Sequence, residues 1–190
     1  MRILRIKLEI ENQSALATVD WSRPVVVIAN HQSYCDIPVV FLTLGRSIGF
    51  LAKYELKRIP FLNYWMKQLG CVFIRRKTSG GGKEAQQELL ESRVPRIVVF
   101  PEGTRSKNGK LQSFKSGGFR LAADWKATVI PLAIQGTRSA WESRKDTKVT
   151  AVKVRVCEPL DLKTVFEKEG QLKIRDFVVP EIRSRMEEFL

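Results

Sequence analysis

The sequence contains a single histidine, His31, and only three cysteines among its 190 residues. Cys35, Cys71 and Cys157 are too widely spaced to suggest a paired disulfide framework or the ligand set of a metal site. We therefore expect free thiols in a reducing compartment and no bound metal. If the protein moves protons at neutral pH, His31 is the obvious base, because histidine is the side chain that titrates closest to neutrality.

Long apolar segments are also missing. No run of apolar residues approaches the roughly 18 that are needed to span a bilayer. The first residues, Met1 to Lys7, alternate charged and apolar side chains and so do not resemble a signal peptide. These absences predict a cytoplasmic protein whose contact with the cytoplasmic face of any membrane is peripheral.

Positive charge is what the sequence has in excess. Thirty-three lysines and arginines against twenty aspartates and glutamates give a net charge of +13. Such a balance implies an anionic partner, which is nucleic acid, an acidic membrane surface or a phosphorylated substrate. Because no helix-turn-helix, zinc-finger or RRM signature is present, we do not expect nucleic acid.

The pattern of apolar residues predicts one α/β domain over residues 1–190. From Leu4 to Ile10, apolar and charged side chains alternate, which is typical of a half-exposed edge strand. Short apolar runs predict further strands and helical spacing predicts helices, so we expect a mixed, mostly parallel β-sheet flanked by helices. The further strands are expected at 24–29, 48–52, 70–76, 96–100, 129–134 and 149–156, and the helices at 36–44, 61–69, 83–92, 117–126 and 173–190.

Two prolines and two polar stretches mark irregular points in this pattern. Pro131 argues against a regular central ladder within strand 129–134. Pro180 predicts an interruption or kink in the C-terminal helix. Residues 12–23 are expected to form a loop, and the glycine-rich residues 79–82 a flexible connector.

The stretch around His31 is the strongest candidate for a site. His31 and Asp36 would point about 140° apart on one ideal helix, so they converge only if His31 lies in a loop and Asp36 begins a helix. The buried-strand pattern of 24–29 favours that arrangement, as does Asp36 acting as an N-cap with Pro38 in the first turn. Asp36 could then fix the tautomer of His31. The structural alternatives are that Asp36 only caps the helix, alone or in a capping box with Ser33, and that His31 is a satisfied structural imidazole.

A second polar stretch, Phe100 to Ser106, comes directly after the predicted strand 96–100. Both polar stretches therefore follow the carboxyl end of a strand. In an open α/β sheet, that edge is where ligands bind. We expect the two stretches to form one site.

Residues 61–69 combine aromatic and basic side chains at helical spacing. Such a helix either lies on a membrane or packs its apolar face on the core, and we favour packing on the core. The apolar positions are Phe61, Leu62, Trp65, Met66 and Leu69, and the basic ones are Lys57, Arg58 and Lys67.

These motifs together resemble the glycerolipid acyltransferase family, most closely the lysophosphatidic acid acyltransferases (PlsC-like enzymes). His31 and Asp36 match the family's His-x4-Asp element. Four blocks occur in the family's order at similar separations within residues 24–138, the motif-bearing core, which is far more specific than any one block. The other three blocks are Gly70 to Arg75 with Lys53 and Glu55 upstream, Phe100 to Ser106, and the Val/Ile-Pro-hydrophobic strand Val129 to Ile134.

The resemblance implies a glycerol-3-phosphate acyltransferase-like fold and transfer of a fatty acyl group to the hydroxyl of a lysophospholipid. The donor would be acyl-CoA or acyl carrier protein, and no metal or redox cofactor is implied. His31 would be the general base and Asp36 would stabilise the imidazolium. Arg75 and Arg105 match positions that bind the acceptor's phosphate. Glu102 would bind an acceptor hydroxyl or lock Arg105 in place, and the remaining substrate-binding positions are Lys53, Gly103 and Thr104.

Two rival functions remain open. A thioesterase or lipid hydrolase would use Ser33 or Cys35 as a nucleophile beside His31. A non-catalytic, basic domain that binds lipid or nucleic acid would not need His31. The chain also departs from many relatives in having only some two dozen residues, without apolar helices, before the first apolar strand, so we expect its positive charge to hold it on an anionic membrane surface.

Overall fold

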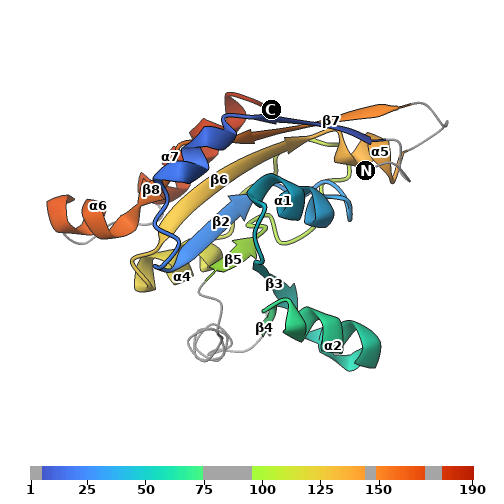
Figure 1. Cartoon of the computed structure of the whole chain (residues 1–190), viewed down its shortest axis with the longest axis horizontal. Helices are drawn as coiled ribbons and strands as arrows, with labels where there is room; N and C mark the ends of the chain where they lie inside the picture. The colour runs from blue at the N-terminus through green and yellow to red at the C-terminus, as the bar shows by residue number, and fades with distance from the viewer. Residues whose placement is uncertain (1–5, 75–95, 144–148, 170–176) are drawn as a thin grey trace.

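The computed structural model describes residues 6–74, 96–143, 149–169 and 177–190, which are built around an eight-stranded sheet (Figure 1). The strands are β1 (Ile6–Glu11), β2 (Val25–Ala29), β3 (Gly49–Lys53), β4 (Val72–Ile74), β5 (Arg96–Val99), β6 (Thr128–Gln135), β7 (Thr150–Val156) and β8 (Leu160–Asp161). Their order is β1-β7-β6-β2-β5-β3-β4, with β8 beside β6. Only β6 with β7 and β6 with β8 pair antiparallel among the described pairs. The predicted α/β fold with a mixed, mostly parallel sheet is confirmed.

The helices lie between the strands and after the last one. They are α1 (Asp36–Leu44), α2 (Pro60–Gln68), α4 (Gly117–Asp124), α5 (Thr137–Ala140), α6 (Leu162–Glu169) and α7 (Val179–Glu187), together with the 3₁₀ turns η1 (Gln13–Thr18) and η2 (Tyr54–Arg58). The sequence predictions missed η1, α5, α6 and β8. Elements of two to eight residues contain too few repeats for a periodic pattern to be read, and η1 lies in the stretch expected to be a loop.

The central strand β2 explains why the fold is so regular around His31. Every side chain of Val25–Ala29 is buried, as a strand covered on both faces requires. Because successive side chains point to opposite faces, Val25 and Val27 pack in one core cluster with α1, whereas Val26 and Ile28 pack in another with α4 and α7. The carboxyl end of β2 is therefore fixed from both sides.

Strand β6 corrects the expectation for Pro131. The strand runs without a break from Thr128 to Gln135 beside β2, and nearly all of its side chains are buried. On its other side β8 pairs only with residues 128 and 129, and β7 only from residue 132 onward. Pro131 lies at this change of neighbour, and its carbonyl accepts the Cys157 N–H at 2.9 Å. The N–H that proline lacks would have pointed toward the junction between β8 and β7, on the side away from β2. The ladder between β6 and β2 therefore loses no hydrogen bond.

Two helix ends follow from single residues. Helix α1 ends at Leu44, as the predicted range 36–44 has it, because Gly45 adopts a left-handed conformation with φ 61° and its N–H bonds to the Phe41 carbonyl. Pro180 lies in the first turn of α7, where the missing N–H costs nothing. The α-helix thus begins beside Pro180 and does not run through it, and because residues 170–176 lie outside the described part of the chain, the expected interruption or kink stays a prediction.

Helix α2 contradicts the favoured expectation that residues 61–69 pack on the core. None of its side chains is buried, and Phe61, Tyr64 and Trp65 are exposed. Only the opposite side of the helix touches the protein interior, where Met66 packs against the core cluster that includes α1. Figure 1 shows α2 at one end of the sheet, beyond β3 and β4.

Several predictions lie outside the described residues. Arg75 and the end of the predicted strand 70–76, the connector 79–82 and the helix 83–92 belong to the undescribed range 75–95. The first four residues of the predicted helix 173–190 are likewise undescribed, up to residue 176. Among the helices that the structure describes, none has the length and apolar character needed to cross a bilayer.

Candidate active site

The two polar stretches meet at the carboxyl edge of the sheet. Strands β2 and β5 pair in parallel, so the loop that contains His31 and the loop from Phe100 to Ser106 leave the sheet side by side. The Ser106 N–H donates to the His31 carbonyl at 2.7 Å, and the His31 N–H donates to Glu102 Oε1 at 2.7 Å. Both main-chain groups of His31 are thus held by the second loop.

The His31 and Asp36 side chains are in direct contact. Nδ1 of His31 lies 2.7 Å from Oδ2 of Asp36, which is completely buried. The same Oδ2 accepts the N–H groups of Gln32 and Ser33 at 2.7 and 2.9 Å. An oxygen that receives two backbone donors acts as an acceptor toward the ring too, so Nδ1 carries the proton, and in the neutral ring Nε2 has the free lone pair.

Asp36 corrects the prediction of an N-cap. It is the first residue of α1, and Cys35 at the cap position makes no side-chain cap hydrogen bond. The bonds from the Ser33 N–H to Asp36 and from the Cys35 N–H to Ser33 Oγ resemble the capping-box alternative. The Asp36 carboxylate turns back toward the preceding loop instead, so it folds that loop and orients the ring in one arrangement. Its position in the first helical turn also places the negative charge where the helix dipole favours it.

Stacking fixes the plane of the imidazole. The His31 ring lies on the Phe100 ring with centroids 4.1 Å apart and an interplanar angle of 16°. The His31 side chain keeps 17% of its surface exposed. A ring held on one nitrogen and one face, but still open to solvent, is suited to exchange a proton with a bound molecule.

Glu102 links the His31 loop to Gln112 by hydrogen bonds. It is almost fully buried, and its second oxygen, Oε2, accepts the Gln112 N–H at 3.0 Å. Burial raises the pKa of Glu102, and the two backbone hydrogen bonds only partly offset that rise. Glu102 therefore positions the His31 backbone, and Arg105 has a different carboxylate partner, contrary to the alternative in which Glu102 locks Arg105.

That partner is Glu142. Nη1 of Arg105 lies 3.3 Å from Glu142 Oε1, and the guanidinium stacks on the Tyr34 ring at 3.8 Å from its centroid. The Tyr34 N–H also donates to Glu142 Oε1 at 3.1 Å. Although partial burial opposes it, hydrogen bonds from Ser33, Tyr34 and Arg105 lower the pKa of Glu142. The sequence analysis missed Glu142, which has no motif around it and is separated from Arg105 by 37 positions.

The other predicted binding residues lie around the same edge. Thr104 is exposed between Gly103 and Arg105, and Gly103 adopts φ 73°, a conformation that favours glycine and lets the loop turn sharply. Lys53 is exposed at the carboxyl end of β3. Arg75 lies outside the described residues.

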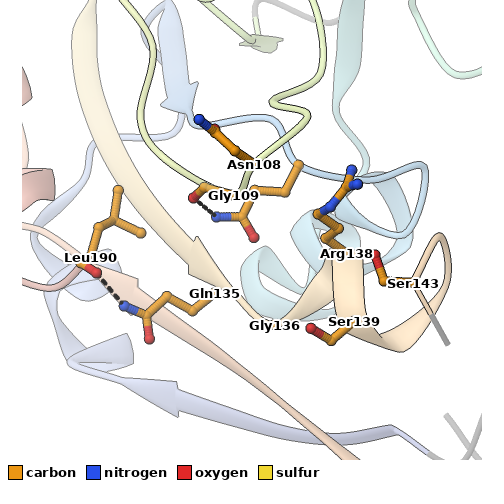
Figure 2. A pocket seen from close by; sticks show the side chains of 9 residues that line it. Asn108, Gly109, Gln135, Gly136, Arg138, Ser139, Ser143 and Leu190 are labelled. Carbon is orange, nitrogen blue, oxygen red and sulfur yellow. Dashed lines mark hydrogen bonds between the residues drawn. The ribbon is translucent and has the colours of Figure 1, made fainter. Parts of the chain in front are cut away.

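A polar pocket of about 460 Å³ opens beside the His31 loop, next to Gln32 (Figure 2). Its wall comes from the loop after β5, from the start of α5 and from Leu190. Among the described residues that line it, Arg138 is the one cation, and it donates from Nη1 to the Ser106 carbonyl at 3.4 Å. The described part of the site holds no cluster of three His, Cys, Asp or Glu side chains that could share a metal ion.

The two side chains of the hydrolase alternative are poorly placed for attack. Ser33 is fully buried and its Oγ accepts the Cys35 N–H at 2.9 Å. Cys35 is buried, and burial raises the pKa of its thiol, which keeps it in the weakly nucleophilic protonated form. Neither side chain contacts Nε2 of His31 in the described hydrogen bonds.

Comparison with known proteins agrees with this geometry. The chain is 35% identical over 133 residues to a chloroplastic 1-acyl-sn-glycerol-3-phosphate acyltransferase of Arabidopsis thaliana, covering 69% of this chain and 36% of that protein. It is 34% identical over 146 residues to the human 1-acyl-sn-glycerol-3-phosphate acyltransferase alpha, covering 73% of this chain and 50% of that protein. The chain thus spans only about a third to a half of the length of these relatives.

The structure has a solved counterpart. The crystal structure of the 1-acyl-sn-glycerophosphate acyltransferase PlsC from Thermotoga maritima matches with a TM-score of 0.74 and 29% identity, covering 97% of this chain and 71% of that one. The family model described as Acyltransferase matches residues 7–135, which include His31, Asp36 and the loop from Phe100 to Ser106. The resemblance found in the sequence is confirmed, and the chain belongs to the Acyltransferase family.

Proposed function

We propose that the protein transfers a fatty acyl group from a thioester to the free hydroxyl of lysophosphatidic acid, which yields phosphatidic acid. The observation that carries this proposal is the 2.7 Å contact between His31 Nδ1 and buried Asp36, which leaves Nε2 free at the ligand-binding edge of the sheet. The names of the relatives support the acceptor class. The donor is acyl-CoA or acyl carrier protein.

The reaction needs one base and no covalent enzyme intermediate. Nε2 of His31 takes the proton of the acceptor hydroxyl while its oxygen attacks the thioester carbonyl. Asp36 stabilises the imidazolium that forms. The tetrahedral intermediate collapses, the C–S bond breaks, and the departing thiolate takes the proton from Nε2. The ester oxygen has replaced sulfur, the proton is conserved, and the exchange requires neither a metal nor a redox cofactor.

Arg105 is the proposed site for the acceptor's phosphate within the described residues. A guanidinium can donate two parallel hydrogen bonds to a phosphate, and Arg105 lies one loop away from His31. Its contact with Glu142 is 3.3 Å long and partly exposed, so a phosphate dianion can compete for the same group. Lys53, Thr104 and Gly103 would complete this side of the site, together with Arg75.

We propose that the reaction takes place at an anionic membrane surface. Lysophosphatidic acid with a long acyl chain resides in a bilayer, and the chain's net charge of +13 favours acidic lipid headgroups. We propose that the protein binds peripherally to the cytoplasmic face.

One assay separates this function from its rivals. Thioester consumption is measured with and without lysophosphatidic acid. Consumption that depends on the acceptor and yields phosphatidic acid supports the transferase. Consumption without acceptor would mean a hydrolase, and no consumption with either donor would mean a binding domain.

A further inference from the structure

Helix α2 carries an aromatic face that the described protein does not cover. Phe61, Tyr64 and Trp65 lie at positions i, i+3 and i+4 on one side of the helix, and they are 76%, 60% and 52% exposed. The rings contact one another edge to face, with Trp65 between Phe61 and Tyr64. They form one continuous patch, which Ile59 and Leu69 extend at either end of the helix. We call these five residues the α2 patch.

The opposite side of α2 shows that this exposure is not a sign of a detached helix. Leu62, Asn63 and Met66 are half-buried, and Met66 packs on the core cluster that contains α1 residues. The helix is therefore held on the protein by one face and presents a second apolar face outward. Large exposed apolar patches on soluble surfaces usually mark a binding surface.

Basic residues adjoin the α2 patch in the sequence. Residues 53–69 contain four cationic side chains, Lys53, Lys57, Arg58 and Lys67, and one acidic side chain, Glu55. Tyrosine and tryptophan are the side chains that prefer the boundary between headgroups and acyl chains, and lysine and arginine near it attract anionic lipids. Aromatic rings flanked by cations are the composition of a helix that lies in a bilayer interface.

The position of α2 fits a lipid substrate. Strand β3 ends at Lys53 on the same edge as the His31 loop, and only η2 separates that end from the start of α2. In Figure 1 the arrows of β2 and β6 point toward the side of the molecule on which α1, α2 and α5 lie. Anchoring through α2 would hold the carboxyl edge of the sheet close to the headgroup region.

We infer that the α2 patch inserts into the interface of an anionic bilayer and so anchors the protein beside its acceptor. This inference rests on the proposed function for the choice of lipid as partner. An acidic protein or a second copy of the chain are the competing occupants, and the following experiments separate them from a bilayer.

The first experiment is sedimentation of the full chain with vesicles. One set contains phosphatidylcholine alone and the other adds phosphatidylglycerol. The wild type should bind the anionic set strongly and the neutral set weakly. The double variant Phe61→Ser/Trp65→Ser should bind anionic vesicles about tenfold less tightly or worse, because two large apolar side chains no longer enter the interface. Phe177→Ser, which removes an exposed aromatic just before α7, is the matched control and should bind like the wild type.

A second measurement uses the fluorescence of Trp65 and disturbs the fold less. Lipids brominated on their acyl chains should quench part of the wild-type emission on binding, and Trp65→Phe should lose that quenching. Wild-type binding by the double variant, equal binding of the wild type to neutral vesicles, or quenching unchanged by Trp65→Phe would each overturn the inference. A dimer in gel filtration that Phe61→Ser/Trp65→Ser converts to a monomer would assign the patch to a second copy and overturn it as well.

Turnover on a short-chain, water-soluble lysophosphatidic acid distinguishes this inference from the proposed function. The double variant should keep wild-type turnover on the soluble acceptor and lose about tenfold or more on the vesicle-bound acceptor. If the wild type shows no transfer to either acceptor, the proposed function fails, while the vesicle-binding result still decides the role of α2.

Discussion

The His31 loop and the segment that leads to helix α2 leave the same edge of the sheet, but the loop and the helix are built in opposite ways. Around His31, the backbone and side chain are held by bonds to Asp36, Glu102 and Ser106, and the supporting carboxylates are buried. On α2, no side chain is buried and the largest rings face outward. Reaction chemistry needs groups fixed in one geometry, whereas contact with a fluid surface needs area and charge more than exact placement.

The largest expected effect comes from removing the base. His31→Ala should lower turnover by about 10² to 10⁴-fold, because a positioned general base contributes that much. Asp36→Asn should cost somewhat less. Circular dichroism should show an intact fold for His31→Ala, and Cys35→Ala, which removes a nearby buried thiol, should remain active. More than a tenth of wild-type turnover in His31→Ala would refute the mechanism.

Arg105 sharpens the comparison, because it is a partly exposed group to which we assign a specific contact with the acceptor's phosphate. Arg105→Ala should lower kcat/KM for lysophosphatidic acid by about ten- to more than a hundredfold, the value of one charge-assisted contact. Arg105→Lys should recover little, since a point charge cannot reproduce the guanidinium fork. A monoacylglycerol without phosphate should show almost no change. An equal loss with both acceptors would mean that Arg105 serves the donor or the structure.

A substitution of Glu102 tests whether the His31 loop depends on the hydrogen bonds that this carboxylate accepts. Each Glu102 oxygen accepts a different N–H, from His31 and from Gln112, and glutamine can supply only one acceptor oxygen. Glu102→Gln should lower the free energy of unfolding by about 1 to 3 kcal/mol in urea titrations and reduce turnover by about tenfold. Glu158→Gln, a change at an exposed carboxylate, should stay within about 0.5 kcal/mol of the wild type. Equal stability of both variants would show that the hydrogen bonds of Glu102 do not stabilise the fold.

Substitution of Glu142 should change acceptor binding less than substitution of Arg105 does, and in the opposite direction. Glu142→Gln frees Arg105 from its counterion, so KM for lysophosphatidic acid should fall by a few fold while KM for a monoacylglycerol stays constant. The pKa of Glu142 is lowered in the folded state, so its charge stabilises the fold above its ordinary value of about 4.3, and this contribution is lost as pH falls through the lowered pKa. The stability difference between wild type and variant should therefore shrink in acid. A raised KM in Glu142→Gln would show that the carboxylate helps binding.

The smallest expected change is in stability at the α2 patch. Phe61→Ser should alter the free energy of unfolding by no more than about 0.5 kcal/mol, because the ring is mostly exposed. Phe119→Ala, at a fully buried ring of α4, should cost about 3 to 5 kcal/mol. Thermal or urea denaturation of the pair measures the contrast directly. A cost above about 2 kcal/mol for Phe61→Ser would mean that the ring packs on protein.

The same contrast explains what the sequence could predict. Strong local patterns predict β2 and α1. A strand buried on both faces is a continuous apolar run in the sequence, and a glycine that can adopt the left-handed conformation often follows the end of a helix. The meeting of His31 with Asp36 was expected from strand, loop and helix start. Its catalytic role remains a prediction, as do the roles of Lys53, Thr104 and Arg105.

What failed depends on which neighbours the chain finds. The carboxylate of Asp36 can cap its own helix or bind the preceding loop, and local sequence does not distinguish the two. An apolar helix face has the same pattern whether protein or lipid covers it, so α2 was assigned to the core. Glu142 and the position of Pro131 depend on contacts between segments far apart in the chain, which no local pattern records.

Strand β1 has a consequence for how the chain folds during synthesis. Ile6 pairs with Thr150 and Glu11 with Arg155, so the first strand waits until nearly the whole sheet has been made. At 5 to 20 residues per second, that wait lasts about 7 to 30 s. An unpaired strand exposed for so long invites pairing with other chains. Lys7 and Glu9, which alternate with its apolar residues, keep the waiting segment charged and lower that risk.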